Sequence, residues 1–99
     1  MDLGEFRDSL ARPSAPSVSA PLQGLWWAAK GDWNRAHKLV QDDGSADAAW
    51  VHAYLHRVEG DLPNARYWYG QAERAAATNA FDVEWDAIVE VLLGKNPSR

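Results

Sequence analysis

The chain has 99 residues, of which 46% are hydrophobic, and it carries a formal net charge of −4. This length suffices for one domain with a hydrophobic core and is too short for two ordinary domains. The absence of cysteine excludes disulfide bonds, thiolate metal sites and cysteine nucleophiles. Lysine and arginine form no cluster, so we expect no nucleic-acid partner.

A membrane location is not expected either. The sequence has no apolar run of the roughly 18 residues that a membrane-spanning helix requires. Its first residues include Asp2 and Glu5, where a secretory signal would be basic. The sequence therefore predicts a cytoplasmic protein.

Residues 1–20 are predicted to form a short helix followed by a linker. Leu3, Phe6 and Leu10 follow one another at spacings of three and four positions, which indicates a short amphipathic helix. Residues 12–21 are rich in proline and serine, a composition typical of a linker. The helix could be detached or could fold back onto the rest of the chain, and its apolar stripe favours folding back.

Residues 21–95 are predicted to form one helical domain, because no stretch alternates with the two-residue period of a strand. The apolar spacing predicts helices that begin near Pro21, Trp33, Ala46, Pro63 and Asp82. The third of these, residues 46–59, carries two apolar stripes and is expected to be central.

The C-terminal helix is predicted to stop at Gly94 and Pro97, leaving residues 96–99 as a tail. The predicted fold class is all-α with about five helices. They form two antiparallel helix–turn–helix hairpins and a C-terminal capping helix.

A short repeat carries the hairpin prediction. Gly31-Asp32 followed by Ala36 recurs, 29 positions later, as Gly60-Asp61 followed by Ala65. Glycine permits a left-handed helix end, and aspartate caps the helix that follows. The small alanine one turn later lets two helix backbones approach closely.

This pattern resembles the tetratricopeptide repeat over residues 20–76. The matching positions are Ala53, Gly60, Ala65, Tyr69 and Ala72 in the second copy and, more loosely, Gly24, Trp27, Gly31, Ala36 and Val40 in the first. His56 stands where the motif has an aromatic residue, and Asp43 stands where it has alanine. The period of 29 is also shorter than the usual length of about 34.

Two repeats are fewer than such stacks usually need, so the terminal helices are expected to act as caps. The block from Trp50 to Asp61, followed by Asn64 to Tyr69, is also similar to a stretch of small uncharacterised microbial proteins. That likeness implies no activity.

The tetratricopeptide resemblance implies a concave surface lined by the first helix of each hairpin. Trp50, Tyr54 and Arg57 share one strip of such a helix, and aromatic residues with arginine are typical of binding hot spots. Tyr67 and Trp68 lie in a helical turn whose side chains are all bulky, and a chain this small cannot bury all of them. We therefore include these two residues in the predicted binding surface. The alternative is that Trp50 and Tyr54 simply pack in the core.

A metal site is the alternative candidate. His52, His56 and Glu59 lie at positions i, i+4 and i+7 of one predicted helix, where two imidazoles and a carboxylate can share an ion. His37, in the preceding helix, could approach them. The competing interpretation is a set of hydrogen-bonded histidines beside a buried helix.

Six tryptophans are many for 99 residues. Trp26 and Trp27, with Trp33 and Trp85, could form an exposed aromatic patch suited to a homodimer. Alternatively, the N-terminal helix could cover them.

No catalytic motif stands out, so we expect a non-catalytic protein–protein interaction module without a cofactor, whose partner is a protein or peptide. The alternative function is a small metal- or ligand-binding protein, possibly an enzyme, that uses the histidines.

Overall fold

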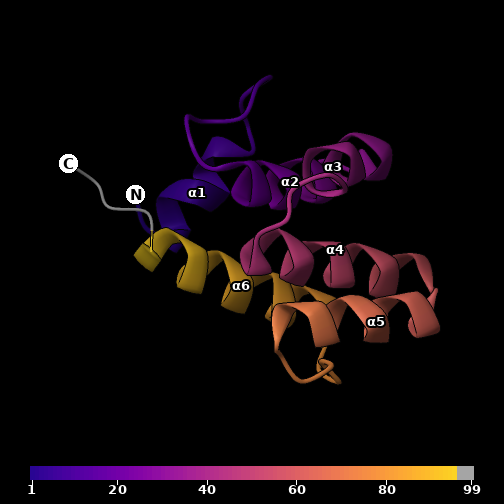
Figure 1. The fold of residues 1–99 in the computed structure, drawn as a ribbon. Coiled ribbons are helices and arrows are strands. Elements are labelled where there is room, and N and C mark those ends of the chain that lie inside the picture. Colours follow the sequence, from indigo (N-terminus) through magenta and orange to yellow (C-terminus); the bar gives the residue numbers. More distant parts are fainter. Residues whose placement is uncertain (96–99) are drawn as a thin grey trace.

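The computed structural model describes residues 1–95. Within this range the chain forms helices and no strand: α1 (Leu3–Ser9), α2 (Ala20–Ala29), α3 (Trp33–Val40), α4 (Ala46–Glu59), α5 (Leu62–Ala72) and α6 (Phe81–Lys95) (Figure 1). The all-α prediction is confirmed, with six helices in the described part of the chain rather than about five. The short helix α1 is capped at its N-terminus by reciprocal hydrogen bonds between Asp2 and Glu5.

Both predicted Gly-Asp breaks are present. Gly31 and Gly60 have φ angles of 86° and 90°, the left-handed conformation that glycine adopts without strain. The carboxylates of Asp32 and Asp61 then accept hydrogen bonds from the third backbone NH of the next helix. As a result α2 packs against α3, and α4 packs side by side with α5 in the opposite direction (Figure 1).

Helix α4 is central, as its two apolar stripes predicted. Every residue from Ala48 to His56 is buried, and α4 contacts α2, α3, α5 and α6. The approach of α2 is close, because a Cβ atom at Gly24 would lie 3.3 Å from Val40 and 3.4 Å from Val51. A larger residue at position 24 would therefore push α2 away from α3 and α4.

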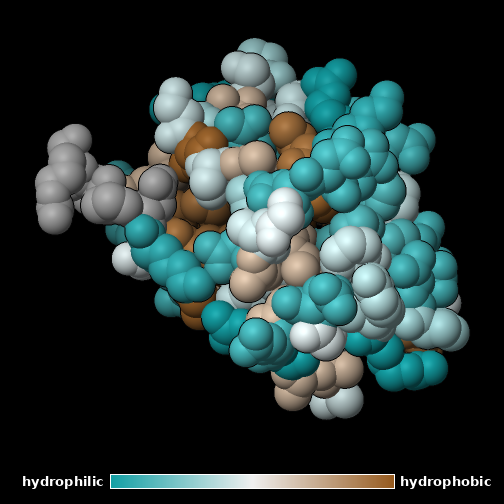
Figure 2. All heavy atoms as spheres, viewed as in Figure 1, coloured by the Kyte–Doolittle hydropathy of each residue, from teal (hydrophilic) through white to brown (hydrophobic). Residues whose placement is uncertain are grey.

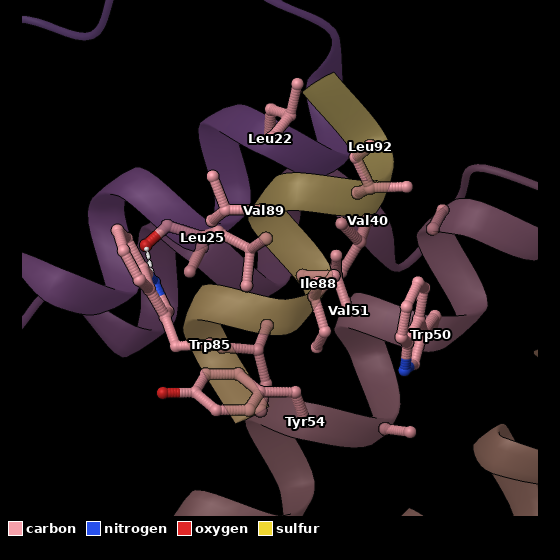
Figure 3. Close-up of a cluster of buried hydrophobic side chains, with 14 of the residues drawn as sticks. Leu22, Leu25, Val40, Trp50, Val51, Tyr54, Trp85, Ile88, Val89 and Leu92 are labelled. Atoms are coloured by element: carbon pink, nitrogen blue, oxygen red, sulfur yellow. Dashed lines mark hydrogen bonds between the residues drawn. The ribbon is translucent and has the colours of Figure 1, made fainter. Parts of the chain in front are cut away.

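Helix α6 crosses both α2 and α4 and supplies one side of the core (Figures 1 and 3). Trp85, Ile88, Val89 and Leu92 are buried, and the indole NH of Trp85 donates to the carbonyl of Leu25 over 2.8 Å. The predicted stop at Gly94 is wrong: the helix continues to Lys95, whose ammonium pairs with Asp47 of α4 over 2.8 Å. Pro97 and the predicted tail 96–99 lie outside the described residues.

The N-terminal helix folds back onto the body of the protein, the arrangement that its apolar stripe favoured. Phe6 is fully buried, with its ring centroid 5.7 Å from that of Trp85. The hydroxyl of Ser9 accepts a hydrogen bond of 3.0 Å from the indole NH of Trp26. Trp26 and Trp85 are consequently buried, so the exposed aromatic patch that the sequence suggested does not form from these two rings.

The face seen in Figure 2 is mostly hydrophilic, with hydrophobic residues showing where the N-terminal part of the chain meets α6. Among residues 1–95, no helix combines the length and apolar character needed to cross a membrane.

Candidate functional site

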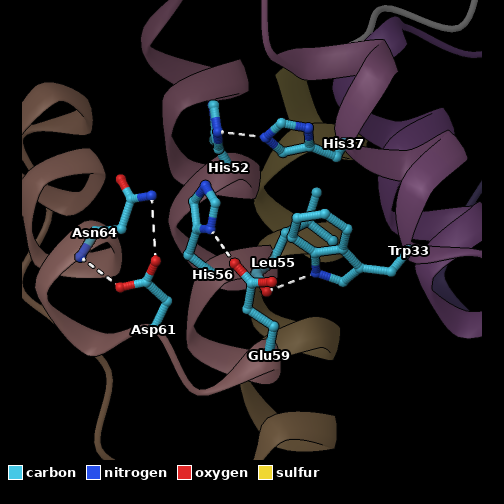
Figure 4. A network of polar contacts seen from close by, with 8 residues as sticks. All are labelled: Trp33, His37, His52, Leu55, His56, Glu59, Asp61 and Asn64. Carbon is cyan, nitrogen blue, oxygen red and sulfur yellow. Dashed lines mark hydrogen bonds and ion pairs between the residues drawn. The ribbon is translucent and has the colours of Figure 1, made fainter.

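All three histidines of the chain meet in one cluster. His37 comes from α3, whereas His52 and His56 come from successive turns of α4 (Figure 4). The Nε2 atoms of His37 and His52 are 3.0 Å apart, and one nitrogen of each ring lies within 4.8 Å of the other two. His52 and His56 are only 4% and 6% exposed, and His37 is half-buried. The sequence placed His52 and His56 together, and the packing of α3 on α4 adds His37.

Two tryptophans hold the imidazole planes. Trp33 stacks on His37 with ring centroids 4.8 Å apart, and Trp68 stacks on His52 with centroids 4.0 Å apart. The indole NH of Trp33 also donates to the carbonyl of Leu55 over 2.7 Å, which fixes this ring against α4. The histidine rings therefore have little freedom to turn.

Glu59 binds the outer edge of the cluster. Its carboxylate lies 2.5 Å from Nδ1 of His56, so this nitrogen carries the proton that the carboxylate accepts. The sequence offered Glu59 as a direct metal ligand, a role that stays a prediction, and in the structure its carboxylate binds His56. Asp61 also lies near His56 and Glu59, but its carboxylate caps α5 and is explained by that role.

Burial favours the neutral forms of His37 and His52. Removal from water, and then the neighbouring His37 and His56, lower the pKa of His52 from 6.5 to about 4. Burial, followed by His56, also lowers the pKa of His37, and Glu59 opposes that shift. At neutral pH both rings are uncharged and keep a lone pair. Within residues 1–95, Nδ1 of His52 is buried and has no hydrogen-bond partner.

Acid is expected to destabilise the metal-free protein through these rings. Between about pH 4 and 6.5 His52 is protonated in the unfolded chain but not in the folded protein, so stability falls as the pH drops. In the presence of EDTA, the free energy of unfolding should decrease by roughly 2 kcal/mol between about pH 7 and pH 5. Denaturant titrations at each pH measure the slope, and His52→Asn should reduce it. A slope unchanged in this variant would contradict the assignment to His52.

A second polar network lies on the other side of α4. Arg57 donates to Glu84 of α6 over 2.8 Å and also to the backbone carbonyl of Asn79. The other oxygen of Glu84 accepts a hydrogen bond of 2.5 Å from the hydroxyl of Tyr69, and burial and this bond raise the pKa of Tyr69. Glu84 is only 4% exposed, so a buried carboxylate of α6 binds one side chain of α4 and one of α5.

Sequence analysis missed Glu84. The signal was available, because Glu84 lies four positions before the buried Ile88 and directly before Trp85, on the apolar stripe of its helix. A lone acid on such a stripe requires a buried partner.

The five residues of the predicted binding surface do not form one exposed surface. Trp50 is buried beneath the guanidinium of Arg74, which lies 3.8 Å from its ring centroid, and Arg57 is occupied by Glu84. Tyr54 is buried at the edge of a cavity. The binding role that the sequence assigned to these three residues stays a prediction.

Tyr67 and Trp68 lie on α5. Tyr67 is 58% exposed, and Trp68 is half-buried because it covers His52. Helix α6 packs against α2 and α4, the two helices that the resemblance makes the lining of a groove, whereas Tyr67 and Trp68 lie on α5, which packs against α4.

The cavity beside Tyr54 has a volume of about 500 Å³. Its walls come from α1 and the residue that caps it, and from α2, α4 and α6. The lining residues are Arg7, Leu10, Ala29, Tyr54, Phe81, Asp82, Trp85 and Asp86. Burial, with Glu84, Asp82 and Asp86 nearby, raises the pKa of Tyr54 to about 12. Three aromatic rings and two carboxylates therefore line one cavity, together with Arg7, which pairs with Asp86.

The histidine cluster and the cavity beside Tyr54 differ in the groups that they could bind. The histidine cluster can supply imidazole ligands, and the aromatic cavity can hold an apolar or cationic group. Comparisons with protein-family models, with curated proteins and with solved structures gave no match.

Proposed function

We propose that the chain is a non-catalytic protein–protein interaction module with two tetratricopeptide-like hairpins, and that it binds a basic peptide segment in the cavity beside Tyr54. The two Gly-Asp turns and the close packing of each helix pair support the hairpin arrangement. The cavity carries the binding proposal. It opens on α2 and α4, the first helices of the two hairpins, which line the binding surface of tetratricopeptide folds.

The chemistry of the cavity favours a positively charged side chain. Tyr54, Phe81 and Trp85 line the cavity with aromatic rings, whose faces attract cations, and the guanidinium of Arg57 already lies 4.8 Å from the ring centroid of Phe81. Asp82 and Asp86 follow one another by one turn of α6, and among residues 1–95 Asp82 has no ion-pair partner. Arg7 already pairs with Asp86, so a basic peptide would add its charge mainly at Asp82. The net charge of −4 favours the same class of partner.

The experiment compares peptides and variants. Fluorescence anisotropy should show that fluorescent peptides with two lysines bind the protein more tightly than otherwise identical peptides with two glutamates. Phe81→Ala combined with Asp82→Asn should weaken binding of the lysine peptide at least about tenfold. Val91→Ala combined with Glu90→Gln removes similar exposed groups from α6 outside this cavity and should leave binding unchanged.

Equal binding by both variant proteins would exclude the cavity as the binding site. Preference for the glutamate peptide would exclude a basic partner.

A further inference from the structure

We propose that His37, His52 and His56 bind one divalent transition-metal ion of the zinc class, with one imidazole nitrogen from each as ligand. This site is separate from the cavity of the proposed function and does not depend on it. It would tie α3 to α4, and therefore the first helix pair to the second.

The spacing of the rings is close to that of a metal site. In tetrahedral zinc sites, Zn–N distances of roughly 2.0–2.1 Å place neighbouring ligand nitrogens roughly 3.3 Å apart. The Nε2 atoms of His37 and His52 are already 3.0 Å apart. The third imidazole nitrogen lies within 4.8 Å of both, so a small ring movement brings it to coordination distance.

The hydrogen bonds of the metal-free cluster are compatible with an ion. Each neutral imidazole has one donor and one acceptor nitrogen. His37 and His52 face each other through Nε2, so one of these two atoms carries the proton of their hydrogen bond. For both Nε2 atoms to bind an ion, that proton must move to the other nitrogen of its ring, and among the described residues Nδ1 of His52 has no partner and can take it.

The surroundings orient the rings as metal sites require. The carboxylate of Glu59 binds Nδ1 of His56, so Nε2 is the nitrogen of this ring that could bind an ion. Trp33 and Trp68 stack on His37 and His52 and limit their rotation. Carboxylates and packed rings of this kind hold metal-binding histidines in place and raise their basicity.

The donor set selects the class of ion. Three imidazoles suit Zn²⁺, Ni²⁺ and Cu²⁺, whereas Mg²⁺ and Ca²⁺ prefer oxygen ligands. The nearby carboxylate of Glu59 supplies negative charge against the two positive charges of the ion. His37 is half-buried, so the ion can enter from that side and keep a fourth position for water.

Untagged protein freed of metal with EDTA should be titrated with ZnCl2 alone by calorimetry. We expect one ion per chain for the wild type. Because the chain has only three histidines, long-range ¹H–¹⁵N spectra resolve each ring, and one equivalent of Zn²⁺ should shift the signals of all three. Co²⁺ should give the visible absorption of a coordinated ion.

Variants locate the site. His37→Asn should abolish stoichiometric zinc binding, and Glu59→Gln should keep the stoichiometry but weaken affinity about 10–100-fold. Asp42→Asn combined with Asp43→Asn removes carboxylates of the exposed turn before α4 and should bind zinc as the wild type does. Circular dichroism checks that each variant is folded.

Unshifted histidine signals at excess Zn²⁺ would overturn the proposal, as would one-to-one binding retained by a folded His37→Asn protein. If a variant does not fold, the wild-type spectra decide, because they require no substitution.

Discussion

Replacement of Glu84 by alanine is expected to lower the free energy of unfolding by about 3–5 kcal/mol. The change removes the carboxylate that pairs with Arg57 and accepts a hydrogen bond from the hydroxyl of Tyr69. The guanidinium then remains largely buried, with the carbonyl of Asn79 as its remaining hydrogen-bond acceptor among those found in residues 1–95. An uncompensated buried charge is among the costliest single defects in a small domain, whose whole stability is about 5–15 kcal/mol.

Urea denaturation followed by circular dichroism measures this loss. Glu90→Ala is the matched control, because Glu90 lies on the same helix and is exposed, and it should change stability by at most about 0.5 kcal/mol. The double variant Arg57→Met/Glu84→Leu should be more stable than Glu84→Ala, since it leaves no charge unpaired. A loss no greater than that of the control would show that this ion pair contributes little.

Trp26→Ala is expected to cost about 3–5 kcal/mol. Trp26 is the largest fully buried side chain, and its indole NH binds Ser9 at the end of α1. Its removal leaves a cavity in the core beside the end of α1 and deprives Ser9 of a donor. The N-terminal helix should loosen as well, so hydrogen exchange of residues 3–9 should rise together with the loss of stability.

The neighbouring Trp27 provides the control. Trp27 is half-buried, and the guanidinium of the exposed Arg35 lies 4.1 Å from its ring centroid. Much of the Trp27 side chain therefore already contacts solvent or an exposed side chain. Trp27→Ala should therefore destabilise the protein less than Trp26→Ala and leave exchange in α1 unchanged. Similar effects of the two substitutions would mean that α1 is not held through Trp26.

Local chemistry made the helix breaks predictable. Gly31 and Gly60 adopt positive φ angles, and the aspartate after each caps the next helix, all within a few residues. The same logic failed at Gly94, which lies inside α6 and does not have the positive φ angle of Gly31 and Gly60. The next residue, Lys95, pairs with Asp47, 48 positions away.

The sequence also predicted one part of the candidate sites and left another part undecided. Spacing along one helix was enough to group His52, His56 and Glu59, because residues four and three positions apart share a face. It could not decide whether Trp50 and Arg57 would meet a partner or the chain itself. Both are covered by other parts of the chain, Trp50 by Arg74 and Arg57 by Glu84.

The sequence by itself determined the all-helical class, the two glycine turns and the shared edge of the α4 histidines, because these depend on backbone preferences and helical spacing within a few residues. Only the tertiary structure decided that His37 joins them, that Glu84 pairs with Arg57 and that α1 packs on Trp26 and Trp85. Those contacts join residues 15 to 79 positions apart. They depend on how whole helices pack, and no local pattern encodes that.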